Sequence, residues 1–185
     1  ISTDAGAVDF SAAVLKAKQS DAEAIFIVTN EEESARMLRE FRKQGVKKPL
    51  IGETTLIGQK VIELAGDAAN GALGHVGLTV EAAPIKAFGA KYKAEYKSES
   101  DHNGIKGYTG VYVLKAAIEK VGKLDRKAVA AAIRGGCFSA KQTPGLLMDV
   151  CFDDKGDLDR ESFMVEVKGG HQVVTATLPP LNAKK

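Results

Sequence analysis

Residues 24–52, with the sequence AIFIVTNEEESARMLREFRKQGVKKPLIG, contain the pattern that decides the fold. They begin with a short, uninterrupted apolar run, which is typical of a strand covered on both faces. Asn30 and Glu33 have the spacing of a capping box, so we expect a helix to begin there and to end at Gly45. The buried stripe of this helix is predicted to consist of Met37, Leu38 and Phe41.

The alternation of helix and strand extends on both sides of this stretch. Asp9 has the position of a helix cap, and the apolar face of the helix that follows is predicted to contain Phe10, Val14 and Ala17. We expect a second strand at 48–52, a helix at about 58–65 and a third strand at 72–79. A β-α-β-α-β order predicts a parallel sheet with right-handed crossovers, so the expected fold class is α/β.

The pattern changes between residues 78 and 83, where we expect the chain to cross into a second packing unit. Three helices follow in succession, at about 84–97, 108–121 and 125–133. Helices without a complete strand between them cannot all bury their apolar faces against the first sheet. The remaining pattern predicts a strand at 147–152, a turn at 153–156 and a hairpin with strands at 162–167 and 172–177.

The composition argues against several classes of partner. The chain has 185 residues, and its 26 basic and 24 acidic side chains give a net charge of +2 without a basic stripe. There is no tryptophan and there are few aromatic residues, so we do not expect nucleic acid as a partner. The apolar runs are far shorter than the roughly 20 residues that span a bilayer.

No catalytic motif is recognisable, because a G-x-S-x-G elbow, a Walker loop and a G-x-G-x-x-G turn are all absent. We therefore expect a binding protein without a cofactor. A calcium loop at Asp153, Asp157 and Asp159 is not expected, because Gly156 is fourth and Met164 twelfth in that run, against a required sixth glycine and twelfth glutamate. A hairpin turn explains these residues better.

Cys137 and Cys151 are the only cysteines. They are too few for a zinc site, and no C-x-x-C is present. Two separate buried thiols and one disulfide, which would fit an oxidising compartment, are both open.

Three segments carry a family resemblance. They are Ile51-Gly52-Glu53 with ELAGDAANG at 63–71, YTGVYVLKAAIEKVG at 108–122, and FDDKGDL at 152–158. Together they resemble the branched-chain amino acid group of periplasmic solute-binding proteins, in order and spacing, over nearly the whole chain. The resemblance implies a partial type I periplasmic-binding-protein fold, in which parallel β-α-β layers from two lobes are joined by hinge crossings and close on a ligand.

The same resemblance implies a domain plan and a function. Residues 1–78 would be part of the second lobe, 79–160 the returning part of the first lobe, and 161–185 a hairpin back on the second lobe with a tail. The implied protein is periplasmic or anchored at the cell surface, and delivers a small solute to the membrane permease of an ABC transporter. The alternatives are a ligand-sensing domain of a receptor or regulator, and an inactive fragment that self-associates through exposed lobe surfaces.

The predicted ligand contacts follow the strands of the first unit, because ligands of open parallel sheets bind beyond the carboxyl ends of the strands. The residues at these positions are Thr29, Asn30 and Glu31 after the first strand, and Glu53, Thr54 and Thr55 after the second. Carboxylate and hydroxyl groups suit a ligand with an ammonium or hydroxyl group. Helix capping is the favoured alternative reading of Asn30 and of the acidic residues that follow it, and Glu31 is the first exception among them.

One departure from the family pattern affects the expected ligand. In amino acid binders, the resemblance implies a carboxylate near the second of these loops, where it engages the α-ammonium group. The matching position here is Thr54, and Glu53 lies one residue earlier. A branched-chain amino acid and a small carboxylic or aromatic acid are therefore both candidate ligands.

Further candidate contacts precede and begin the helix at 108–121. His102 and Asn103 are expected in a loop, and Tyr108 at the start of the helix, at family positions that border the cleft. A surface histidine and plain core packing are the alternative readings of His102 and Tyr108. His75 and His171 are expected in a strand and a hairpin, without a role in binding.

Overall fold

A computed structural model describes residues 1–78, 82–158 and 160–180 of the chain. The chain divides into two compact units. Unit 1 contains Ile1–Gly77 and Ser162–Leu178, and unit 2 contains the described residues between Leu78 and Glu161 together with Pro179 and Pro180. Part of the predicted crossing segment, residues 79–81, lies outside the described residues.

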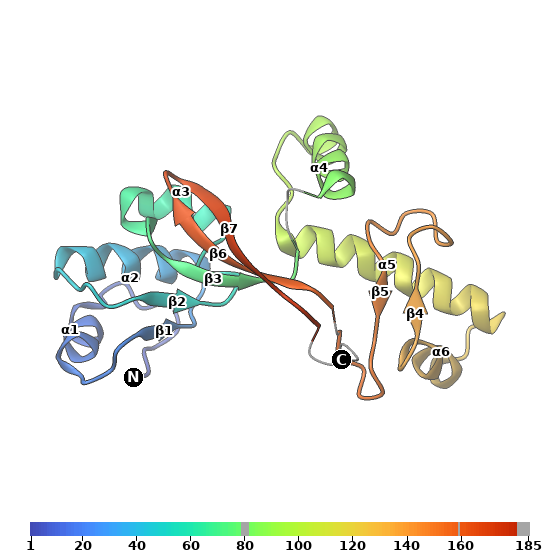
Figure 1. The fold of residues 1–185 in the computed structure, drawn as a ribbon, viewed down its shortest axis with the longest axis horizontal. Coiled ribbons are helices and arrows are strands. Elements are labelled where there is room, and N and C mark those ends of the chain that lie inside the picture. The colour runs from blue at the N-terminus through green and yellow to red at the C-terminus, as the bar shows by residue number, and fades with distance from the viewer. Residues whose placement is uncertain (79–81, 159, 181–185) are drawn as a thin grey trace. The chain divides into compact units, whose positions relative to one another are not determined.

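Unit 1 is built on one mixed sheet (Figure 1). Its strands are β1 (Ile25–Ile27), β2 (Leu50–Gly52), β3 (Leu73–Val76), β6 (Ser162–Lys168) and β7 (His171–Leu178), in the order β1-β2-β3-β6-β7. The pairs β1–β2 and β2–β3 are parallel, as predicted, because a helix connects each strand to the next. The late hairpin β6–β7 lies antiparallel beside β3. The α/β fold class is confirmed.

The helices of unit 1 begin and end close to the predicted positions. They are α1 (Ser11–Gln19), α2 (Glu31–Lys43) and α3 (Gln59–Ala65), followed by the 3-10 helix η1 (Gly66–Ala69). The predicted capping box is present at the start of α2, where Asn30 and Glu33 each bond the backbone of the other. Phe10, rather than Asp9, is the N-cap of α1, although the Asp9 carboxylate accepts a hydrogen bond from the Ser11 amide at 2.8 Å.

The core of unit 1 joins the helices to one face of the sheet. It contains all six residues predicted for the stripes of α1 and α2, namely Phe10, Val14, Ala17, Met37, Leu38 and Phe41. The prediction that the first strand is covered on both faces is wrong. Ile27 is buried, but Phe26 and Val28 on the opposite face are 66% and 67% exposed. β1 is the edge strand of the sheet, and the exposure of Phe26 and Val28 shows that the face opposite Ile27 is largely uncovered.

Two glycines let the loop after β2 pack closely on the sheet. Gly52 and Gly74 are partners in neighbouring strands. A Cβ atom at Gly52 would lie 2.5 Å from the Cβ of Leu56, and one at Gly74 would lie 2.5 Å from Ile57. Since Leu56 and Ile57 are fully buried, these glycines determine how the segment between β2 and α3 sits on the sheet.

Unit 2 contains three helices and a short two-stranded sheet. The helices are α4 (Ala83–Tyr96), α5 (His102–Val121) and α6 (Arg126–Ile133), and the strands are β4 (Cys137–Phe138) and β5 (Val150–Cys151). Asp125 caps α6 by accepting hydrogen bonds from the amides of Lys127 and Ala128. β4 was not predicted, and the strand expected at 147–152 is reduced to two residues.

The sequence prediction places the start of α5 too late. Asp101 is its N-cap, and the Asp101 carboxylate accepts a hydrogen bond from the Gly104 amide at 2.7 Å. His102 and Asn103 therefore lie in the first turn of the helix and not in a loop. The glycines at 104 and 107 made the sequence of this segment resemble that of a loop. Asp, however, is one of the residue types preferred at a helix N-cap, where its carboxylate accepts a hydrogen bond from a backbone amide two or three residues later.

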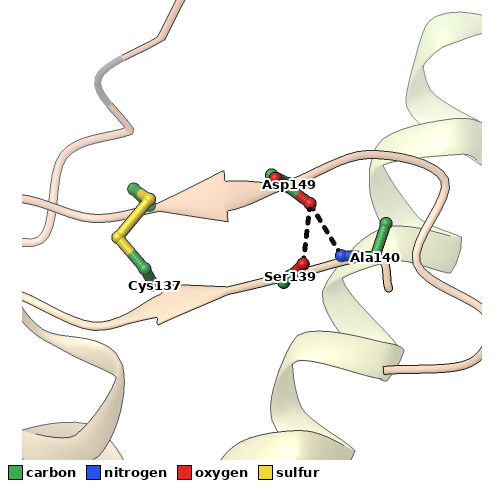
Figure 2. Close-up of a disulfide and its surroundings, with 5 residues drawn as sticks. Cys137, Ser139, Ala140 and Asp149 are labelled. Atoms are coloured by element: carbon green, nitrogen blue, oxygen red, sulfur yellow. Dashed lines mark hydrogen bonds between the residues drawn. A yellow bond between two sulfur atoms is a disulfide. The ribbon is translucent and has the colours of Figure 1, made fainter. Parts of the chain in front are cut away.

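Cys137 and Cys151 form a disulfide, so the alternative of two separate thiols is wrong (Figure 2). The two residues are direct partners in β4 and β5. Beside the bridge, the Asp149 carboxylate accepts hydrogen bonds from the Ser139 hydroxyl at 3.2 Å and the Ala140 amide at 2.8 Å. A disulfide that closes a loop of this length stabilises the folded state by roughly 3 kcal/mol.

Candidate functional site

The carboxyl edge of the parallel strands in unit 1 is the candidate ligand site. Ile27, the last residue of β1, pairs with Gly52, the last residue of β2, so the chain leaves both strands at the same level. The six residues predicted in this unit follow the ends of these two neighbouring strands, and they are Thr29, Asn30, Glu31, Glu53, Thr54 and Thr55. Helices α2 and α3 also begin at this edge, and at α2 the capping box and the acidic residues of the first turn already satisfy the positive end of the helix.

Two of the residues after β1 are engaged in local structure. The half-buried Thr29 hydroxyl lies 2.8 Å from the Ser34 hydroxyl, in a hydrogen bond whose donor can be either group. The Asn30 side chain caps α2, as part of the capping box with Glu33. Their hydroxyl and amide groups thus hold the start of α2 in place.

Glu31 faces a cation that sequence reasoning missed. Its carboxylate lies 3.7 Å from the ammonium group of Lys60, and the two side chains are 36% and 58% exposed. Lys60 lies in the first turn of α3, so this pair connects the starts of α2 and α3. An exposed pair of this kind contributes little to stability, and both charged groups are accessible to a solute at this edge. The position of Lys60 two residues after the expected start of α3 at Gly58 is the signal that could have identified it.

The loop after β2 contains an exposed carboxylate, that of Glu53, and a hydroxyl group held by a hydrogen bond, that of Thr54. The exposed Glu53 carboxylate accepts a hydrogen bond from the Thr55 amide at 3.1 Å. The Thr54 hydroxyl donates to the His75 carbonyl oxygen at 3.0 Å, which ties the loop to β3. Because its proton is used in this bond, Thr54 can only accept a hydrogen bond from a ligand. Glu53 is therefore the group in this loop best placed to meet a cationic ligand group.

The residues predicted in unit 2 lie along α5. His102 is half-buried and Asn103 is exposed, both in its first turn. The Tyr108 ring packs against those of Phe88 and Tyr112, with ring centroids 4.7 and 4.9 Å away. A hydrogen bond with Tyr112, and secondarily burial, raise the pKa of Tyr108. Tyr108 thus belongs to a cluster of aromatic rings that connects α4 to α5, and its predicted contact with a ligand stays a prediction.

The remaining histidines and the aspartates at 153–159 were not predicted to bind a ligand. His75 and His171 are exposed, the former on β3 and the latter at the start of β7. The Asp153 carboxylate accepts hydrogen bonds from the amides of Lys155 and Asp157, which gives the predicted turn. Asp159 lies outside the described residues. Within residues 1–78, 82–158 and 160–180, no group of three or more His, Cys, Asp or Glu side chains is arranged to hold a metal ion.

Over the described part of the chain, every helix is too short or too polar to cross a membrane.

Comparison with known proteins identifies the family. A family model described as "Periplasmic binding protein" matches residues 1–172. The chain therefore belongs to the periplasmic binding protein family. Members of this family bind solutes, which agrees with the expectation of a binding protein.

Individual relatives define the group within this family. The leucine-, isoleucine-, valine-, threonine-, and alanine-binding protein of Pseudomonas aeruginosa is 29% identical over 163 residues, which are 88% of this chain and 42% of that protein. The leucine-binding protein LivK of Thermotoga maritima superposes with a TM-score of 0.79 at 28% identity, over 95% of this chain and 50% of that one. The protein is thus of type I and of the branched-chain amino acid group.

The same fold occurs in a more distant solved structure. A solute-binding protein of an ABC transporter from R. palustris, in complex with benzoate, superposes with a TM-score of 0.77 at 20% identity, over 95% of this chain and 48% of that one. The chain spans about half the length of the relatives it matches, between 42% and 50% of these three proteins.

Proposed function

We propose that this chain is part of the substrate-binding component of an ABC uptake transporter. In this proposal, unit 1 belongs to the second lobe and unit 2 is the returning part of the first lobe. A small solute is captured when the lobes close, and is delivered to a membrane permease. The observation that carries the proposal is the grouping of six polar side chains at the carboxyl edge of the unit 1 sheet, where open parallel sheets bind their ligands.

The chemistry of this edge suits a small solute with both charges. The exposed Glu53 carboxylate would bind an ammonium or hydroxyl group, and Glu31 lies at the same edge. The exposed Lys60 ammonium group favours a carboxylate. A branched-chain amino acid carries both groups, and relatives that are 28% and 29% identical are named as binding leucine and similar amino acids.

A small carboxylic or aromatic acid is the second candidate ligand. This candidate is favoured by Thr54, which occupies the position where amino acid binders of this family have a carboxylate. The Thr54 hydroxyl donates its proton to the His75 carbonyl oxygen, so it does not replace that carboxylate. In this loop, Glu53 would then be the one carboxylate that could bind the ammonium group of a ligand. If Glu53 faces solvent in the closed form, this loop has no counter-charge for an amino group, and the Glu31 carboxylate at the same edge is paired with Lys60, so that an acid is favoured instead.

Ligand binding would act by shifting an equilibrium between open and closed lobes. The chain passes between the units near Gly77–Leu78, at Glu161–Ser162 and at Leu178–Pro179, so the backbone at these points would absorb the change. We place the protein in the periplasm or at the cell surface, in keeping with its family, and the disulfide is compatible with an oxidising compartment.

Calorimetry on the protein expressed from its whole reading frame tests this proposal. We expect saturable binding of leucine, isoleucine or valine, or of benzoate. Glu53→Gln removes the charge and keeps the shape, and should weaken binding of an amino acid by roughly 10- to 100-fold. Glu23→Gln is the matched control, because Glu23 is also exposed but precedes β1, at the opposite end of the strand. Absence of binding by all these solutes would contradict the proposal, and equal effects of the two substitutions on the binding of an amino acid would contradict the contact with Glu53.

A further inference from the structure

The disulfide between Cys137 and Cys151 lies on the open face of the two-stranded sheet in unit 2. Successive side chains of a strand point to opposite faces. Phe138 and Val150, the other pair of this ladder, are 6% and 4% exposed and belong to the core. Cys137, by contrast, is exposed, and Cys151 is half-buried. The disulfide is therefore on the side of the ladder that faces away from the core.

Other contacts hold the two strands together beside the disulfide. On one side of it, the Phe152 amide donates a hydrogen bond to the Gly136 carbonyl oxygen at 2.9 Å. On the other side, the Asp149 carboxylate accepts the hydrogen bonds from Ser139 and Ala140 that Figure 2 shows. These bonds do not involve the sulfur atoms. The ladder should therefore persist when the disulfide is open.

The disulfide closes a loop, residues 138–150, that packs on helix α5. Its two cysteines are 14 residues apart in sequence. Leu146, within the loop, is buried in the core of unit 2. At Gly145 the backbone lies so close to the Tyr112 ring of α5 that an added Cβ atom would overlap this ring. A cross-link limits the conformations that the chain between its ends can adopt. The closed disulfide thus restricts the segment that packs on Tyr112.

Tyr112 belongs to the cluster of aromatic rings that connects α4 to α5. Its ring centroid lies 4.9 Å from that of Tyr108, which lies 4.7 Å from that of Phe88. A hydrogen bond also joins the two tyrosines. Tyr96, the last residue of α4, is 65% exposed. A displacement of Gly145 would therefore act on Tyr112 first, on Tyr108 through it, and least on Tyr96.

We propose that the disulfide is a reversible site of thiol–disulfide exchange, which an external dithiol opens in the folded protein. The state of the disulfide sets the position of Gly145 against Tyr112, and thereby the contact of Tyr112 with Tyr108. Exposed disulfides are the labile and regulatory ones, whereas structural disulfides resist reduction. The exchange concerns unit 2 alone and is independent of the solute that the protein binds.

The exchange takes place in two steps. A thiolate of the dithiol attacks the sulfur of Cys137, the more exposed residue, which breaks the S–S bond and forms a mixed disulfide. Cys151 leaves as a thiolate and takes a proton from water. The second thiolate of the reagent then attacks the reagent's own sulfur in the mixed disulfide, and Cys137 is released and protonated in the same way. The protein thus gains two electrons and two protons, and the dithiol leaves as an internal disulfide.

Reduction kinetics test whether the disulfide opens in the folded protein. The protein is treated with dithiothreitol at neutral pH, and the free thiols are trapped by alkylation and located by mass spectrometry. We expect a rate that is proportional to the dithiothreitol concentration and is unchanged in about 1 M urea. Opening by unfolding would make the rate at least about fivefold higher in about 1 M urea. That result, or a disulfide that dithiothreitol leaves closed, overturns the proposal.

A monothiol tests which sulfur is attacked. Glutathione cannot complete the second step within one molecule, so the mixed disulfide accumulates and peptide mapping locates it. We expect glutathione on Cys137, because this residue is exposed and Cys151 is half-buried. Glutathione found on Cys151 instead overturns the order of attack.

Nuclear magnetic resonance of protein with isotope-labelled tyrosine rings tests the coupling. Reduction should shift the ring signals of Tyr112 and Tyr108 and leave that of Tyr96 unchanged, and reoxidation should restore them. The variant with both Cys137→Ser and Cys151→Ser is the matched control, because it should show the signals of the reduced protein and no response to dithiothreitol. An unchanged Tyr112 signal overturns the proposal. Equal shifts of all three signals also overturn it, because they indicate unfolding of unit 2.

Discussion

Replacement of Gly52 by alanine should destabilise unit 1 and leave unit 2 unchanged. The added Cβ would lie 2.5 Å from the Leu56 Cβ and 2.9 Å from the Ile27 carbonyl oxygen. Neither neighbour can move freely, because Leu56 is fully buried and Ile27 belongs to β1. Overpacking of this kind costs about 1–3 kcal/mol, and restriction of the unfolded chain returns about 0.4–1 kcal/mol. The expected net loss is roughly 2 kcal/mol.

The distribution of tyrosines allows the two units to be followed separately. All four tyrosines, Tyr92, Tyr96, Tyr108 and Tyr112, lie in unit 2, so their fluorescence reports its unfolding. Far-UV circular dichroism reports both units. In a urea titration, Gly52→Ala should lower the midpoint of the dichroism transition assigned to unit 1 by about 1 M. The midpoint of the tyrosine signal should not move.

Gly89→Ala is the matched control, with the opposite expected sign. Gly89 lies within α4, and a Cβ there would meet only the Ser100 hydroxyl at 3.8 Å. Alanine in a helix is more stable than glycine by about 1 kcal/mol, so the tyrosine midpoint should rise. A Gly52→Ala protein with an unchanged dichroism transition would refute the idea that the two glycines let the loop after β2 pack on the sheet.

Three other predictions concern the ends of elements. Replacing both Cys137 and Cys151 by serine should cost roughly 3 kcal/mol in the tyrosine transition, and an equal loss in unit 1 would contradict the assignment of this bridge to unit 2. Asn30→Ala should destabilise unit 1 by about 1 kcal/mol in the dichroism transition because it removes the cap of α2, and no loss would show that the cap is dispensable. The amides of Asp157, Lys155 and Gly156 hold the pKa of Asp153 below its ordinary value. Its stabilising contribution is therefore complete above the ordinary aspartate pKa of about 3.9 and is lost as the pH falls through the lower folded value; Asp153→Asn should flatten this acid dependence of the tyrosine midpoint.

Several features of unit 1 were predictable because their causes are local. The capping box of Asn30 and Glu33 and the stripe of Met37, Leu38 and Phe41 depend on residues within three turns of one helix. Their side chains encounter each other whatever the rest of the chain does. The parallel order of β1, β2 and β3 follows in the same way, since a helix connects each strand to the next.

The features of unit 2 that the sequence mispredicted or left open had weak or misleading local signals. Glycines at 104 and 107 concealed the first turn of α5, so His102 and Asn103 were assigned to a loop. The pairing of Cys137 with Cys151 depends on β4 and β5 meeting, and β4 is too short to show a period in the sequence. The sequence around each of the two cysteines does not distinguish a disulfide from two free thiols.

The order of elements in unit 1, the start of α2 and the family of the protein were all determined by sequence, because short-range spacing and resemblance act along the chain. Only tertiary structure decided that β1 is an edge strand with Phe26 exposed, that Lys60 faces Glu31, and that the Thr54 hydroxyl bonds the His75 carbonyl oxygen. The two contacts join segments that are distant in sequence, and the position of β1 depends on the order of strands in the whole sheet. Their geometry depends on how strands align in the sheet, which no local pattern contains.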